Sequence, residues 1–131
     1  MIDMPAGGVG ALPFASLGDL GLDRRKVAQC ALSRICGVCG ESLSRPVAFL
    51  GSADEAARNA FHLPPVHPAC AEVAVTRWGS HSAVLGQARE PGEWRLVTTS
   101  GFEFVRPTAE WADRRPVFAP NSVIEERVLT P

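Results

Sequence analysis

Cys36-Gly37-Val38-Cys39-Gly40 and His67-Pro68-Ala69-Cys70 are the two stretches of this 131-residue sequence that decide its fold. A Cys-x2-Cys turn places two sulfurs within reach of one ion, because two intervening residues let the chain curl back. The second pair spans the first turn of an expected helix, which presents side chains three residues apart on one face. Three thiolates and one imidazole form a donor set that zinc takes at tetrahedral corners. Cys36, Cys39, His67 and Cys70 therefore predict one closed zinc site.

Burial and redox chemistry are the competing interpretations of these pairs. Simple burial would leave the coincidence of both pairs unexplained in a chain with four cysteines and three histidines. A thioredoxin-like redox pair normally follows a strand in a βαβ unit, and the flanking residues do not supply one. Because four protein ligands close the coordination shell, we expect the zinc to be structural rather than catalytic. The N-terminus of the helix is expected to favour the thiolate of Cys70.

The residues around the pairs predict short helices and strands. A β-hairpin is expected from two alternating runs, 94–98 and 102–106, with 99–101 as the turn. The other expected elements follow from capping residues, prolines and apolar runs. They are a helix over 24–33 after Asp23, a strand over 46–50, a capping-box helix after Ser52, a return strand over 60–63, and a helix from Pro68 to about Trp78 that Gly79 ends.

Ile35 to Gly40, a hairpin over 46–63 and a helix opened by His67 to Cys70 together resemble the treble-clef zinc fingers. More narrowly, residues 34–40, 47–51 and 63–70 resemble a family of small uncharacterised proteins from actinobacteria and their phages. The resemblance covers residues 34–78. It implies the fold and the metal, but a fold does not imply a function.

The expected fold is small α+β, with a zinc-stapled, treble-clef-like centre, short helices and a C-terminal β-hairpin. A length of 131 residues fits a single domain. Its parts are an irregular N-terminal segment (1–21), the zinc-binding centre (22–79), and the hairpin with a Pro-rich C-terminal segment (80–131). The 12 glycines and 11 prolines indicate a loop-rich fold, which buries little surface and gains from a metal staple.

Charge and hydropathy limit the cellular setting. The net charge of −1 creates no global field that would recruit a polyanion. No apolar run approaches the ~20 residues that span a bilayer, and Pro and Gly interrupt an N-terminus that lacks a basic leader. We therefore expect a cytoplasmic protein, whose reduced cysteines favour metal binding or burial over disulfides.

Three further groups of residues were candidates for function. No matching Asp-His pair precedes His62, so we expect a structural histidine there, while His81 is expected in a loop and Cys30 on the apolar face of its helix. The zinc deaminase signature is absent, because it needs His-x-Glu upstream of its cysteine pair. Several aromatic residues could stack nucleic-acid bases, but no basic stripe interleaves with them. They are Trp78, Trp94, Phe102, Phe104 and Trp111.

The leading expectation is a noncatalytic protein-interaction or assembly module, in which 1–21 and the C-terminal segment dock on a partner protein. It predicts an exposed apolar patch of roughly several hundred Å², or residues 1–21 extended from the core. The alternative is a nucleic-acid-binding accessory factor that uses a basic patch before the zinc site. A treble-clef nuclease or small hydrolase ranks third and requires a cleft with His62 or His81 beside a carboxylate. The basic patch consists of Arg24, Arg25, Lys26, Arg34 and Arg45. We infer no small-molecule substrate.

Overall fold

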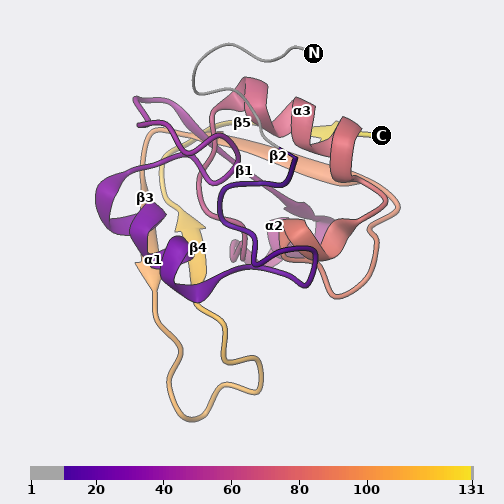
Figure 1. Ribbon diagram of the computed structural model, residues 1–131. Coiled ribbons are helices and arrows are strands. Elements are labelled where there is room, and N and C mark those ends of the chain that lie inside the picture. Colours follow the sequence, from indigo (N-terminus) through magenta and orange to yellow (C-terminus); the bar gives the residue numbers. More distant parts are fainter. Residues whose placement is uncertain (1–10, 131) are drawn as a thin grey trace.

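The computed structural model describes residues 11–130, and part of the expected N-terminal segment, residues 1–10, lies outside them. The described residues form a small α+β fold, as expected, with three α-helices, one short 3₁₀ helix and two antiparallel sheets (Figure 1). In chain order the elements are α1 (Arg24–Ser33), β1 (Val47–Ser52), α2 (Ala53–Arg58), α3 (Pro68–Trp78), η1 (Ser82–Leu85), β2 (Trp94–Thr99), β3 (Phe102–Val105), β4 (Val117–Pro120) and β5 (Val123–Leu129).

The helices begin where their capping residues predict. The Asp23 carboxylate accepts hydrogen bonds from the backbone N–H groups of Arg25 and Lys26 at the start of α1. Ser52 and Glu55 form the expected capping box of α2. Pro68 occupies the first turn of α3, where its missing N–H costs nothing. The three predicted helices are therefore confirmed.

The pairing of the C-terminal strands differs from the expected hairpin. β2 pairs with β1 and β5, whereas β3 pairs with β4, so the pairing of 94–98 with 102–106 was wrong. The 99–101 segment is a bend in a longer ladder, because Ser100 N–H donates to the Ser122 carbonyl and Asn121 N–H donates to the Gly101 carbonyl. A C-terminal hairpin is still present, with β3 and β4 as its arms and a long loop over 106–116 at its tip (Figure 1).

The expected return strand beside β1 is also wrong. Phe61 pairs with Phe118 of β4, and Val66 makes the one bridge to Ala48 of β1. The antiparallel neighbour of β1 is β2, which pairs with it along its full length, from Val47↔Thr99 to Ser52↔Trp94. The hairpin implied by the resemblance over 46–63 is therefore not formed, because the bridge from Ala48 to Val66 lies beyond that range.

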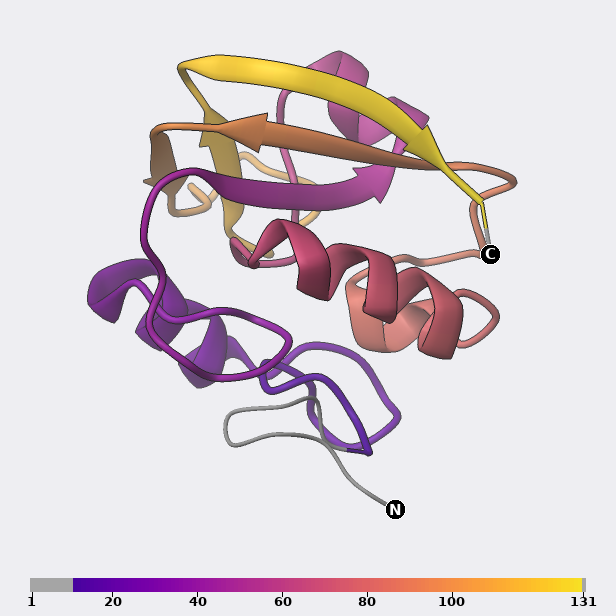
Figure 2. The ribbon, with the colours of Figure 1, turned by 90° about the horizontal axis from the view of Figure 1, so that it is seen from above.

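Both faces of β1 are buried, each against its own apolar cluster. Ala48 and Leu50 point toward α3, which lies across one side of the three-stranded sheet β1-β2-β5 (Figure 2). Val47 and Phe49 point to the opposite face, as the two-residue period of a strand requires. There Phe49 packs against three other rings with centroids 5.4–5.8 Å away, those of Phe61, Phe102 and Phe118.

The described part of the N-terminal segment lies against the metal-binding turn. The N–H groups of Phe14 and Ala15 donate to the carbonyls of Val38 and Gly37, each at 3.0 Å. The indole N–H of Trp78 donates to the Ala11 carbonyl at 3.2 Å. Residues 11–21 are thus part of the fold rather than an arm that extends away from it. No helix within residues 11–130 is long and apolar enough to cross a membrane.

Candidate metal centre

The structure brings together the four predicted ligand residues. The ligand atoms of Cys36, Cys39, His67 and Cys70 all lie within 4.8 Å of one another. The Cys39 sulfur lies 3.4 Å and the Cys70 sulfur 3.7 Å from Nδ1 of His67. These residues come from a turn and a helix start that are separated by β1 and α2, so the cluster joins two distant parts of the chain.

Backbone hydrogen bonds shape the first pair into a tight turn. Cys36 N–H donates to the Glu41 carbonyl at 2.8 Å, and Gly40 N–H donates to the Cys36 carbonyl at 2.9 Å. Gly40 has φ +79°, a left-handed conformation that side-chain-bearing residues rarely adopt. The turn directs the N–H groups of Val38 and Cys39 at the Cys36 sulfur, each at 3.4 Å. Such donors stabilise a thiolate.

The second pair is held against the first by its own flanking residues. Gly37 N–H donates to the Pro65 carbonyl at 2.9 Å, which ties the turn to the segment ahead of α3. Nε2 of His67 lies 3.0 Å from the Ser42 carbonyl, which can only accept, so Nε2 carries the proton. In the neutral ring the other nitrogen, Nδ1, has the lone pair, and it faces the cysteines. This is the tautomer that a metal ligand requires.

The cysteines repel one another as thiolates unless a cation lies between them. Burial raises the pKa of Cys70, and the neighbouring charges of Cys36 and Cys39 raise it further. Burial likewise raises the pKa of Cys39. A dication offsets this repulsion, and the four side chains could hold one metal ion.

The five basic residues of the predicted patch are spread along α1 and the turn after it. Lys26 Nζ lies 5.6 Å from the ring centroid of Phe14, and the Arg34 guanidinium lies 5.3 Å from that of Phe102. Arg24 and Arg25 are exposed at the start of α1, with Arg34 at its far end, about 15 Å away at 1.5 Å per residue. Arg45 is exposed in the following loop. The five residues therefore extend along the length of α1 and into the loop that follows.

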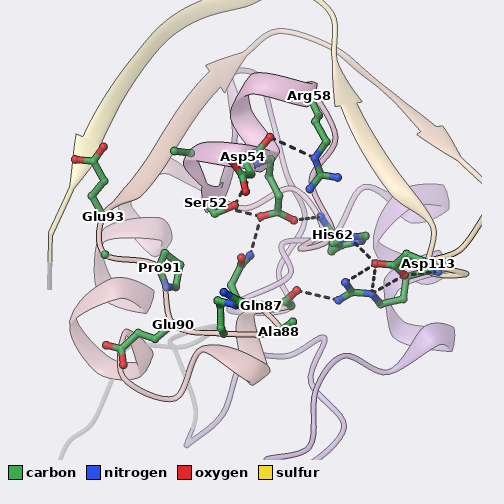
Figure 3. Close-up of a pocket in the computed structure, with 16 residues that line it drawn as sticks. Ser52, Asp54, Arg58, His62, Gln87, Ala88, Glu90, Pro91, Glu93 and Asp113 are labelled. Carbon is green, nitrogen blue, oxygen red and sulfur yellow. Dashed lines mark hydrogen bonds and ion pairs between the residues drawn. The ribbon is translucent and has the colours of Figure 1, made fainter.

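The other single-residue expectations have mixed outcomes. Cys30 packs in the core, where burial raises the pKa of its thiol to about 12. His81 is exposed in the loop before η1, as expected. Trp78 and Trp94 are buried, so they form no stacking platform. His62, however, does lie beside a carboxylate in a cavity of about 900 Å³, the arrangement that an enzyme would require (Figure 3).

His62 joins the body of the fold to the 106–116 loop. Its Nδ1 donates to the Pro116 carbonyl at 3.3 Å, and its Nε2 lies 3.5 Å from Oδ2 of Asp113. Burial lowers the pKa of His62, and the positive charge of Arg115 lowers it further. The Arg115 guanidinium donates a hydrogen bond to the Asp113 carboxylate at 2.7 Å and another to the Gly86 carbonyl at 2.9 Å. These contacts anchor the end of the loop.

Glu55 also lines this cavity. The residue is 2 % exposed. Its carboxylate accepts hydrogen bonds from the N–H groups of Ser52 and His62, each at 3.1 Å, and from the Gln87 side chain at 2.7 Å. The capping box indicated only the contact within α2. Nothing local in the sequence marks Gln87, Asp113 or Arg115, because they meet only when the 106–116 loop folds back.

Arg115→Ala is expected to release this loop while leaving the core intact. Asp113 would lose the hydrogen bonds from Arg115 that hold its pKa well below the usual range. Amide hydrogen exchange over 106–116 should accelerate at least about tenfold, with the rates in β1 and β2 unchanged. In the wild type the lowered pKa keeps this anchor in place down to about pH 4, and it is lost only as the pH falls through that lowered value. Unchanged exchange in the loop would contradict the anchoring role.

Comparison of this chain with family models, curated proteins and solved structures found no match in any of the three. What the molecule can do is therefore argued from its own geometry.

Proposed function

We propose that the protein is a noncatalytic, zinc-stabilised interaction or assembly module of the cytoplasm, with the β5 edge (Val123–Leu129) as its docking surface. The observation that carries this is the position of β5. The strand order β1-β2-β5 ends there, and no strand within residues 11–130 pairs with its outer side. Val123, Ile124 and Val128 are 53 %, 61 % and 47 % exposed. A free edge offers backbone N–H and C=O groups to which another chain can add a strand.

Zinc is the ion that best suits the Cys36-Cys39-His67-Cys70 cluster. A tetrahedral site with Zn–S bonds of ~2.3 Å separates its sulfurs by about 3.8 Å, and the four ligand atoms lie within 4.8 Å of one another. Three thiolates with one imidazole favour zinc over hard cations such as magnesium. Four protein ligands leave no open position for water, so zinc would supply cross-linking rather than catalysis.

The cavity beside His62 supports a structural role better than a catalytic one. A general base needs a lone pair that is open to the substrate. Nδ1 of His62 is used by the Pro116 carbonyl, and Asp113, fixed by Arg115, stands against Nε2. Glu55 already accepts three hydrogen bonds. The spread of the basic residues and the net charge of −1 likewise give no focused field for nucleic acid.

The docking surface can be tested with two matched substitutions of exposed apolar residues. Ile124→Asp places a charge on the β5 edge, and Leu32→Asp places one on α1, where Leu32 is 71 % exposed. We expect immobilised wild-type protein and Leu32→Asp to retain the same partner from a host lysate or from a purified preparation of this chain. Ile124→Asp should retain at least about tenfold less of it. Equal retention by all three proteins would contradict the proposal.

A further inference from the structure

We propose that the partner at the β5 edge is a second copy of this chain, paired strand to strand in antiparallel order about a two-fold axis. This inference rests on the interaction role proposed above and names its partner. Such a pairing would join two three-stranded sheets into one six-stranded sheet of order β1-β2-β5-β5-β2-β1. Closed two-fold association is the commonest form of assembly in soluble proteins.

The sequence of β5 is self-complementary about its centre. Val123-Ile124-Glu125-Glu126-Arg127-Val128-Leu129 has apolar residues at both ends and three charged residues in the middle. If Glu126 lies on the two-fold axis, Glu125 of each copy faces Arg127 of the other. This favourable pair then occurs twice.

Each register places one like-charge pair on the axis, Glu126 with Glu126 in this one, but the neighbouring registers gain no opposite-charge pair. Residues that face each other across an antiparallel pair must lie on the same face of the sheet. The two strands can therefore slide past each other only by two residues at a time, which moves the two-fold axis by one residue. The next register in one direction places Glu125 against Glu125, and the next in the other direction places Arg127 against Arg127. Like charges directly opposite each other are destabilising. Only the register centred on Glu126 pairs Glu125 with Arg127.

Ion pairs within each copy partly neutralise the charges of Glu126 and Arg127. The two Glu126 side chains would face each other on the axis, but each lies 3.3 Å from the Arg95 guanidinium of its own chain. Arg127 contacts Glu72 on α3, and a guanidinium has five donors, so it can also reach a second carboxylate. The one irregularity of the β2-β5 pairing lies at Thr98/Thr99, opposite the start of β5. It leaves Ile124 without a partner on β2, whereas residues 125–127, which carry the charge pairing, lie in the regular part of the strand.

The interface would be small. A seven-residue strand buries less than the ~800 Å² per partner of a standard stable interface, so the dimer should form and dissociate rapidly. Sedimentation velocity of the full chain, over about two decades of protein concentration, should show a reversible shift from monomer to dimer. Arg127→Glu places two like-charge pairs in the interface and should weaken association about tenfold or more.

A charge-swapped variant keeps the test specific. The double substitution Glu125→Arg with Arg127→Glu restores opposite charges across the axis and should recover dimerisation to within about threefold of wild type. Glu72→Gln removes the contact of Arg127 within its own chain and should leave the dimer unchanged. A wild-type monomer at every concentration, or failure of the swapped variant to recover, would overturn the second-copy inference. If a host protein is then still retained through Ile124, the interaction role stands; if nothing binds at that edge, both proposals fall.

Discussion

Replacing Cys36 by serine is expected to unfold the domain, because the cluster would lose its most buried ligand. Cys36 is fully buried and its sulfur receives three backbone N–H groups, from Val38, Cys39 and His67. Structural zinc contributes about 10–16 kcal/mol of apparent binding free energy at neutral pH. That is as large as the roughly 5–15 kcal/mol of net stability that whole domains have. Circular dichroism should show loss of the cooperative thermal transition.

Cys30→Ala is the matched control for that substitution. Cys30 is also fully buried but is not a ligand, so its loss removes a little packing, at a cost of about 1 kcal/mol. The control should keep a cooperative transition a few degrees below that of wild type. If Cys36→Ser melted as cooperatively as Cys30→Ala, the cluster would not be what holds the two halves of the fold together.

Gly51→Ala is expected to cost about 3–5 kcal/mol of the free energy of unfolding, from overpacking and from lost hydrogen bonds. A methyl group at Gly51 of β1 would overlap the Glu55 carboxylate and approach a ring carbon of Phe61 to 2.8 Å. Since both neighbours are buried, neither can move aside freely. Displacing Glu55 also leaves the N–H groups of Ser52 and His62, which donate to its carboxylate, without a hydrogen-bond acceptor.

Gly92→Ala provides the comparison for this effect. A methyl group at Gly92 would meet nothing within 4 Å, so its effect should stay within about 0.5 kcal/mol. Urea unfolding of both variants measures the difference directly. Similar midpoints for the two variants would show that the packing of Glu55 under β1 is not as tight as the structure has it.

Local signals in the sequence were sufficient for the helices and for the cluster. Asp23, Ser52 and Pro68 mark helix starts through backbone chemistry that operates within a few residues. The two ligand pairs carry their own spacing. The helix starts and the spacing within each ligand pair are settled by neighbours along the chain, whereas the meeting of the two pairs was inferred from the chemistry of a four-ligand zinc site.

Strand partners could not be predicted in the same way. Residues 94–98, 99–101 and 102–106 have the pattern of a hairpin, yet the Thr99 hydroxyl accepts from the N–H groups of Gly101 and Ser122 and turns the segment into a bend. β1 gains more from β2 than from residues 60–63, because that pairing lets both faces of β1 be buried. The contacts among His62, Asp113 and Arg115 depend on the same long-range pairing. A pattern of two-residue alternation gives a strand its faces but not its neighbour.

The metal content of the purified full chain tests the central claim most directly. Native mass spectrometry of protein prepared without added metal should show one zinc ion per chain, and Cys36→Ser should show none if any folded protein is recovered. Treatment with a chelator should remove the ion and the cooperative transition together. A folded chain that carries no metal, or one that keeps its transition after the ion is removed, would contradict the account.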